Sequence, residues 1–189
     1  MNNLLKGINI YLIGMMGSGK TTVGRELATL MGYKFFDTDA LIEKLAGESI
    51  SEIFKREGEE GFRSLESKVL SELSAYTRLA IATGGGIVLK QTNWSYLQQG
   101  LVVWLDVPVE ILLKRIEGDT TRPLLQVDDP ASELQRRLDQ RQPLYAQADL
   151  RITVTFGETP AQTAARVIEA IPTVLKPSAS PNGSMTHDP

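Results

Sequence analysis

The chain contains no cysteine and only one histidine, His187. Without cysteine there can be no disulfide, no thiol nucleophile and no thiolate metal ligand. His187 lies in a stretch rich in Pro, Ser, Asn and Gly, so histidine-dependent catalysis and zinc binding are not expected. No apolar run approaches the roughly 18 residues that a membrane span requires, and we expect no membrane partner.

The charge of the chain is also small, with a net value of −3 over 189 residues. No overall field therefore draws the chain to nucleic acid, and we expect no nucleic-acid partner. Hydrophobic residues make up 42% and charged residues 23%, the balance of a soluble globular chain of one domain. We expect that domain over residues 1–176 and a disordered tail over residues 177–189. A cytoplasmic monomer is the default expectation.

Short β-rich apolar runs alternate along the chain with helical patterns. The expected strands are residues 8–13, 33–37, 79–82, 101–105 and 150–155. The expected helices are residues 21–31, 40–77 with breaks at Gly47 and Gly58, 91–98, 108–116, 131–148 and 160–170. Residues 117–130 are polar, contain Gly and Pro, and are interpreted as a mobile lid. The alternation predicts a three-layer α/β/α fold with a five-stranded parallel sheet, in which ligands bind beyond the carboxyl ends of the strands.

The loop after the first expected strand is a phosphate-binding P-loop. Gly14, Gly19, Lys20 and Thr21 satisfy the pattern G-x-x-x-x-G-K-[ST]. Glycines let backbone N–H groups turn toward phosphate oxygens, and the helix that begins here directs its positive dipole end at them. The alternative is a glycine turn without a ligand, but the apolar strand before it and the amphipathic helix after it favour the phosphate site. The residues expected to contact ATP are Gly14, Gly17, Ser18, Gly19, Lys20, Thr21 and Thr22.

Two carboxylates, Asp37 and Asp39, follow the second expected strand. One can hold a water bound to Mg²⁺, and the other can orient or deprotonate an attacking hydroxyl, as phosphoryl transfer requires. An equally simple interpretation is that Asp39 caps the next helix. Both interpretations can hold together.

Glycines and arginines supply the remaining candidates. The run Gly84, Gly85 and Gly86 loses more backbone entropy on folding than other residues would. Such a run is therefore typical of a place where something must approach the backbone closely. An ordinary turn is the alternative. Most arginines are expected on solvated helix faces. Arg122 differs because it lies in the expected lid, where closure could bring it onto phosphates.

Together these segments resemble the shikimate kinase family. The resemblance rests on GMMGSGKTTVGRELA, FFDTDALIE, ISEIF…GEEGFRSLE, ATGGGIV, WLDVP, TRPLL and RQPLYAQAD, in one order from about residue 8 to about residue 170. It implies a P-loop kinase fold like that of nucleoside monophosphate kinases. It also implies transfer of the γ-phosphoryl of ATP to the 3-hydroxyl of shikimate, a step toward chorismate and aromatic amino acids.

On the donor side, the resemblance implies Mg²⁺ as the cofactor of ATP. Lys20 would stabilise the transferring phosphoryl, Thr21 would bind Mg²⁺, and Asp37 would support the ion through water. Arg122 of the lid would cover the phosphates. Some relatives carry a basic residue where this chain has residues 156–160 (FGETP), which leaves adenine to backbone or apolar contacts and to stacking by Arg115.

On the acceptor side, the resemblance implies that Asp39 contacts the shikimate hydroxyls and accepts the proton. Arg63 and Arg141 would clamp the carboxylate, Glu66 would help to position Arg63, and the glycine run centred on Gly85 would present its backbone. The residue types suit a hydroxylated acid, because the arginine fork matches a carboxylate. Phosphoryl transfer needs no covalent nucleophile, which suits a chain without cysteine.

Two other functions compete with this interpretation. A kinase of the same architecture could act on gluconate or a nucleotide, but a nucleotide acceptor favours a larger basic cluster than this chain has. A non-catalytic P-loop module would be indicated by a damaged catalytic set, whereas Lys20, Thr21, Asp37, Asp39 and Arg122 are all present. Fold alone would not separate these possibilities.

Overall fold

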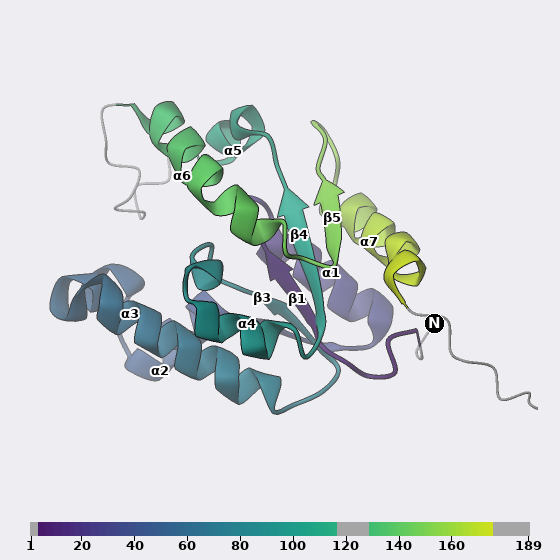
Figure 1. Ribbon diagram of the computed structural model, residues 1–189, viewed down its shortest axis with the longest axis horizontal. Coiled ribbons are helices and arrows are strands. Elements are labelled where there is room, and N and C mark those ends of the chain that lie inside the picture. Colours follow the sequence, from purple (N-terminus) through teal and green to yellow (C-terminus); the bar gives the residue numbers. More distant parts are fainter. Residues whose placement is uncertain (1–3, 117–128, 176–189) are drawn as a thin grey trace, which may run out of the picture.

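The computed structural model describes residues 4–116 and 129–175. Its five strands are β1 (Ile10–Ile13), β2 (Lys34–Asp37), β3 (Leu79–Ala82), β4 (Leu101–Asp106) and β5 (Leu150–Thr153). Its helices are α1 (Lys20–Met31), α2 (Thr38–Ala46), α3 (Ile50–Ser74), α4 (Gln91–Leu97), α5 (Val109–Ile116), α6 (Pro130–Tyr145) and α7 (Pro160–Val174), with a 3₁₀ helix η1 (Ile87–Leu89). The strands pair in parallel in the order β2-β3-β1-β4-β5. The expected five-stranded parallel sheet with helices on both faces is therefore confirmed (Figure 1).

Each face of the sheet has its own hydrophobic core. Tyr11 and Ile13 of β1 lie in the core that α3, α4, α5 and α6 help to form, whereas Ile10 and Leu12 lie in the core formed with α1 and α7. Side chains of a strand alternate between its two faces, and here both faces are covered. This double burial explains why the strands are continuous apolar runs in the sequence.

Both expected helix breaks are confirmed, and both occur at glycines with positive φ. Gly47 ends α2 with φ 72°. Gly58, with φ 70°, interrupts the helical geometry inside α3. Between them, Ser49 and Glu52 form a reciprocal capping box that begins α3. Glycine reaches positive φ with little strain, so the long helical pattern of the sequence divides at these positions.

Several element boundaries differ from the sequence expectation. The helix α7 continues to Val174, beyond the expected end at residue 170, and η1 was not expected. Pro130, assigned to the end of the lid, is the first residue of α6, because the Asp129 side chain accepts a hydrogen bond from Ser132 N and caps the helix. Residues 117–128 of the expected lid, including Arg122, and the expected tail over residues 177–189 lie outside the described residues.

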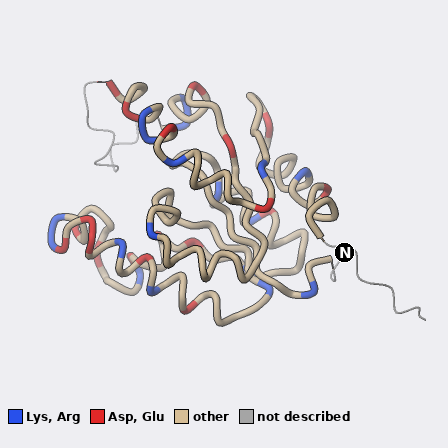
Figure 2. Tube along the Cα trace, viewed as in Figure 1, with Lys and Arg blue, Asp and Glu red and all other residues tan. Residues whose placement is uncertain are grey.

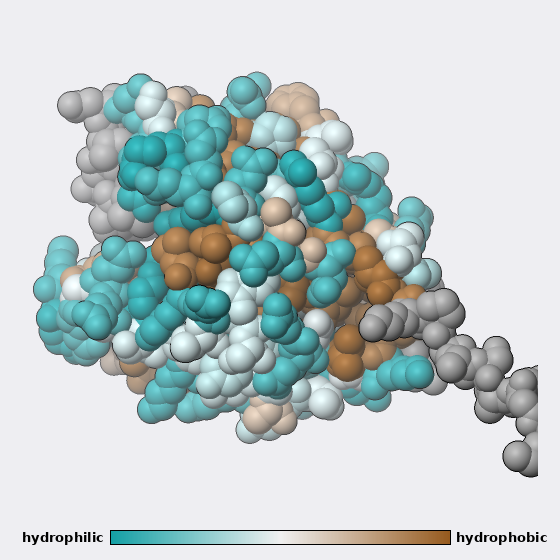
Figure 3. Space-filling view, in the orientation of Figure 1, coloured by the Kyte–Doolittle hydropathy of each residue, from teal (hydrophilic) through white to brown (hydrophobic). Residues whose placement is uncertain are grey.

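The described surface carries mixed charge. On the face in Figure 2, basic and acidic residues are interspersed along the helices. Within α6, for example, Glu133 pairs with both Arg136 and Arg137. In the same orientation, hydrophobic side chains gather over the middle of the face, where α6 packs against η1 (Figure 3). None of the helices in the described ranges is long and apolar enough to cross a membrane.

Candidate active site

The P-loop forms a closed turn around the ammonium group of Lys20. Nζ of Lys20 donates hydrogen bonds to the carbonyl oxygens of Gly14 (2.9 Å) and Met15 (2.7 Å) and to Oγ of Ser18 (3.3 Å). Lys20 is 8% exposed, so its charge is held close to the loop with little access to water. The ammonium group is thus held by the loop's own oxygens, beside the turn that would receive phosphate.

The first turn of α1 has no side-chain cap. Gly19 precedes the helix with φ 93°, and none of its first-turn residues is acidic. Such a helix start presents several backbone N–H groups and a positive dipole end, which together attract anions. Opposite this turn, Arg115 of α5 donates through Nη1 to the carbonyl oxygens of Gly17 (3.3 Å) and Ser18 (3.2 Å).

Thr21 in the first turn of α1 and Asp37 at the end of β2 contact each other directly. The hydroxyl of Thr21 donates to Oδ2 of Asp37 at 2.6 Å. Oδ1 of the same carboxylate accepts from the backbone N–H groups of Asp39 (3.0 Å) and Ala40 (3.3 Å). Asp37 is therefore the N-cap of α2, and the sequence interpretation that gave this role to Asp39 is wrong. Asp39 lies in the first turn of α2, where a negative charge is favourable.

The three consecutive glycines after β3 each lie against a different charged residue. A Cβ on Gly84 would meet Oε1 of Glu66 and Oδ1 of Asp39, and a Cβ on Gly86 would overlap the guanidinium of Arg63. The carbonyl oxygen of Gly85 accepts a hydrogen bond from Nη1 of Arg141 at 3.2 Å. Gly85 also approaches the P-loop, because its Cβ position lies 3.4 Å from the carbonyl oxygen of Gly14.

The absence of side chains at these glycines thus has a steric reason, which offsets the entropic cost of the run. It lets four charged side chains from three helices, α2, α3 and α6, converge beside the phosphate loop. These are Asp39, Arg63, Glu66 and Arg141.

Arg63 and Glu66 form the most buried ion pair of this cluster. Nη1 of Arg63 donates to Oε2 of Glu66 at 2.6 Å, and the two side chains are 14% and 0% exposed. Burial raises the pKa of Glu66, against the lowering effect of Arg63. The pKa of Arg63 is raised as well, because the attraction of Glu66 outweighs the opposing effect of burial.

Comparison with known proteins shows which family contains this chain. The family model described as shikimate kinase matches residues 16–172. The shikimate kinase of Nostoc punctiforme is 59% identical over 180 residues, which cover 95% of this chain and 99% of the relative. The chain belongs to the shikimate kinase family.

Further members agree with this assignment in sequence and in structure. The shikimate kinase of Synechococcus elongatus is 57% identical over 175 residues, covering 93% of this chain and 92% of the relative. A shikimate kinase from Acinetobacter baumannii, solved in complex with shikimate, superposes with a TM-score of 0.84 at 43% identity, covering 90% of this chain and 96% of that one. As a member of the shikimate kinase family, the chain is an ATP-dependent small-molecule kinase.

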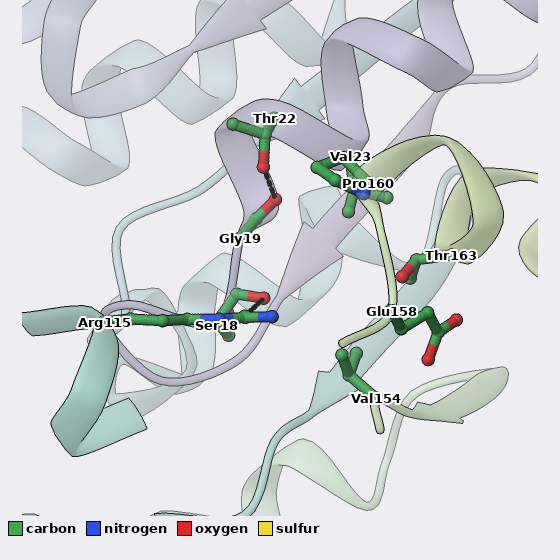
Figure 4. Close-up of a pocket in the computed structure, with 9 residues that line it drawn as sticks. All are labelled: Ser18, Gly19, Thr22, Val23, Arg115, Val154, Glu158, Pro160 and Thr163. Carbon is green, nitrogen blue, oxygen red and sulfur yellow. Dashed lines mark hydrogen bonds between the residues drawn. The ribbon is translucent and has the colours of Figure 1, made fainter. Parts of the chain in front are cut away.

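A cavity of about 240 Å³ lies beside the P-loop of this kinase (Figure 4). Its lining residues are Ser18, Gly19, Thr22, Val23, Arg115, Val154, Glu158, Pro160 and Thr163. In Figure 4, Arg115 enters from the α5 side, facing Val154 and Pro160 across the cavity. The carboxylate of Glu158 is turned away from Arg115, and it accepts hydrogen bonds from Thr155 N and from Arg166. Of the segment over residues 156–160, left open at the sequence level, Glu158 and Pro160 therefore help to form one wall of a concave, partly apolar site.

Sequence reasoning missed two residues that hold the cluster together. The hydroxyl of Thr38, which is 0% exposed, accepts a hydrogen bond from Gly84 N at 3.0 Å. The hydroxyl of Tyr145 donates to the carbonyl oxygen of Gly85 at 2.7 Å. Thr38 could have been suspected from its place between two aspartates at the end of a strand. No local signal points to Tyr145, because its partner is 60 residues away.

Proposed function

We propose that this kinase transfers the γ-phosphoryl group of ATP to the 3-hydroxyl of shikimate, giving shikimate 3-phosphate and ADP. The observation that carries the proposal is the convergence of Asp39, Arg63 and Arg141 on the glycine run directly beside the P-loop. Two guanidinium groups and one carboxylate match an acceptor that has one acid group and several hydroxyls. The relative from Acinetobacter baumannii, solved with shikimate bound, supports this acceptor.

Each acceptor-side residue has a proposed part in binding or proton transfer. Arg63 and Arg141 bind the shikimate carboxylate, and Glu66 holds Arg63 through the 2.6 Å ion pair. Asp39 accepts the proton of the 3-hydroxyl while that oxygen bonds to the γ-phosphorus and the bond from phosphorus to ADP breaks. The backbone of residues 84–86 faces the bound acceptor.

On the donor side, Lys20 stabilises the charge of the phosphoryl group in transit, and the N–H groups of the loop and of α1 bind the phosphates. The proposed contacts of the nucleotide are Gly14, Gly17, Ser18, Gly19, Lys20, Thr21, Thr22 and Arg115. Arg115 stacks on adenine in the cavity beside the loop. Arg122 lies outside the described residues, and its role over the phosphates stays a prediction from the family resemblance.

Mg²⁺ is the proposed cofactor, held by Thr21 directly and by Asp37 through water. The donor set fits this ion, because Mg²⁺ typically takes one or two protein oxygens and completes its shell with water and phosphate oxygens. Thr21 and Asp37 meet at 2.6 Å next to the phosphate loop. In the described part of the chain there is no cluster of three or more His, Cys, Asp or Glu side chains that could hold a metal without phosphate. When bound, the ion neutralises phosphate charge.

A cytoplasmic monomer that binds neither nucleic acid nor membrane remains our prediction. Its support is the net charge of −3 and the mixed charge along the described helices. Such a surface has no single-signed field to recruit a polyanion.

The unmodified protein should release ADP from ATP and Mg²⁺ only when shikimate is added. The measurement is coupled ADP detection, with formation of shikimate 3-phosphate followed by mass spectrometry. Removing Mg²⁺ with EDTA should abolish the reaction, and restoring Mg²⁺ should recover it, because the ion, and neither Thr21 nor Asp37, supplies the positive charge that neutralises the phosphates. Gluconate and nucleoside monophosphates serve as control acceptors. ADP release that ignores shikimate, or that follows a control acceptor instead, would overturn the proposed function.

The variant Gly86→Ala should lower kcat/KM for shikimate by about tenfold, because the new methyl group overlaps the guanidinium of Arg63 and overpacking of this kind costs roughly 1–3 kcal/mol. Gly100→Ala is the matched control. Gly100 lies just before β4, at the end of the sheet opposite the site. Its methyl group would meet the backbone oxygen of Asn9. Steady-state kinetics should show the loss in the first variant only, with KM for ATP unchanged. Equal losses in both variants would mean that Gly86 affects the fold rather than Arg63.

A further inference from the structure

Tyr145, the last residue of α6, is completely buried between the two halves of the active site. Its hydroxyl donates to the carbonyl oxygen of Gly85 at 2.7 Å and lies 3.6 Å from the sulfur of Met15 in the P-loop. Met15 in turn accepts a hydrogen bond from Lys20 through its carbonyl oxygen. One phenol group therefore contacts the glycine run and the phosphate loop together.

The carbonyl oxygen of Gly85 is the shared partner of Tyr145 and Arg141. It accepts from the tyrosine hydroxyl at 2.7 Å and from Nη1 of Arg141 at 3.2 Å. A carbonyl oxygen has two lone pairs, so both donors can be satisfied at once. Residues four apart on a helix lie on the same face, which brings Arg141 and Tyr145 of α6 to this single atom.

The ring of Tyr145 is held independently of its hydroxyl. It stacks on Trp104 of β4, with ring centroids 5.8 Å apart and an interplanar angle of 27°. Trp104 itself is 1% exposed. The packing therefore fixes the ring, and the direction of the hydroxyl follows from the ring.

The surroundings of the hydroxyl are those of the acceptor cluster. Burial raises the pKa of Tyr145, and the charges of Arg141, Arg63 and Glu66 act on the same group. The phenol therefore keeps its proton at neutral pH and remains a hydrogen-bond donor to Gly85. A buried tyrosine hydroxyl needs a partner in any protein, but here the partner is the atom that also orients an arginine of the site.

We propose that Tyr145 is a positioning residue for acceptor binding, which fixes the Gly85 carbonyl and through it the guanidinium of Arg141. This inference rests on the proposed function, because it assigns Arg141 to the carboxylate of the acceptor. With Gly85 held by the tyrosine, Arg141 keeps one N–H on the loop and directs its other donors toward the acceptor. Without the hydroxyl, the loop oxygen and the arginine gain freedom that binding must then remove.

Tyr145→Phe isolates the hydroxyl because it keeps the ring and its stacking on Trp104. The expected result is a rise of about 3- to 10-fold in KM for shikimate, the size of one net hydrogen bond. KM for ATP should stay within about 2-fold, as expected for a site that does not share the contact. Tyr11→Phe is the matched control, because Tyr11 is also 0% exposed but its hydroxyl contacts Asn9 at 3.5 Å. The control should leave both KM values unchanged.

A second comparison tests whether Tyr145 acts through Arg141. In an Arg141→Lys background, adding Tyr145→Phe should change kcat/KM for shikimate by less than about 2-fold, because the group that the hydroxyl positions is already lost. The ratio kcat/KM remains measurable when shikimate does not saturate. Thermal unfolding of every variant shows how much of any effect is loss of fold.

Three outcomes would overturn the inference while leaving the proposed function intact. They are an unchanged KM for shikimate in Tyr145→Phe, an equal rise in both KM values, and a full additional loss in the Arg141→Lys background. If the unmodified protein instead fails to phosphorylate shikimate, the proposed function itself is wrong.

Discussion

Lys20→Met should lower kcat by about 10²- to 10³-fold, the loss seen when one preorganised donor is removed from a transition state. Methionine has an unbranched chain of similar length without the charge, so the change removes the ammonium group and little volume. That group is already fixed by the carbonyl oxygens of Gly14 and Met15. To act on the phosphoryl group it must exchange at least one of these hydrogen bonds for one to a phosphate oxygen.

The control for this prediction is Lys34→Met, because Lys34 is an exposed lysine at the start of β2, away from the strand ends that carry the site. Its kcat should be unchanged. The measurement is kcat at saturating ATP and shikimate, with thermal unfolding to verify that each variant is folded. If folded Lys20→Met retained more than about a tenth of the activity, Lys20 could not be the group that stabilises the phosphoryl transfer.

The donor half of the site could be predicted because its signals are local. Gly14 to Thr21 are consecutive, and their motif fixes the order of strand, loop and helix around the phosphates. The alternation of strands and helices then predicts that the segments after β1, β2 and β3 meet at one edge of the sheet. The structure has Asp37 and the glycine run at that edge.

The acceptor half depends on contacts that no local pattern encodes. That Gly84 and Gly86 leave room for Glu66 and Arg63 depends on how α3 folds back onto the strand edge. From the glycines themselves the sequence predicted only that something approaches the run closely, and its immediate neighbours prove to be side chains of the same protein. Tyr145 was missed for the same reason, since only the packing of α6 shows where its hydroxyl lies.

The capping of α2 shows a different limit, that of element boundaries. Two aspartates two residues apart both suit an N-cap, and the choice depends on the residue at which β2 ends. Because β2 continues through Asp37, the carboxylate of Asp37 reaches the N–H groups of Asp39 and Ala40. The side chain of Asp39 is thereby not required for capping and can serve the chemistry proposed for it.

Arg63→Met should destabilise the fold by about 3–5 kcal/mol at pH 8, because it leaves the carboxylate of Glu66 buried without its cation. Glu66 is 0% exposed, and its burial already raises its pKa. A carboxyl group whose pKa is raised by folding contributes most stability below its unfolded pKa, about 4.3, and loses that contribution as pH rises through its folded pKa. The destabilisation should therefore be larger at pH 8 than at pH 5. Urea unfolding at the two pH values measures this difference.

Two further variants separate stability from acceptor binding. Adding Glu66→Gln to Arg63→Met should restore part of the lost stability, because glutamine carries no charge, yet it should not restore binding of shikimate. Arg63→Lys should do the reverse: it keeps a cation beside Glu66 but raises KM for shikimate about tenfold or more, since a hydrogen bond to a charged group contributes about 1.5–3 kcal/mol.

Arg56→Met is the control for the loss of an arginine from α3. Arg56 pairs with Glu48 and Glu57, and its side chain is 57% exposed. A surface pair of this kind contributes no more than about 1 kcal/mol, so the control should unfold nearly as the unmodified protein does. If Arg63→Met were no more destabilising than this control and showed no dependence on pH, Glu66 would not need its ion pair. If Arg63→Lys bound shikimate normally, the guanidinium fork would have no part in holding the carboxylate.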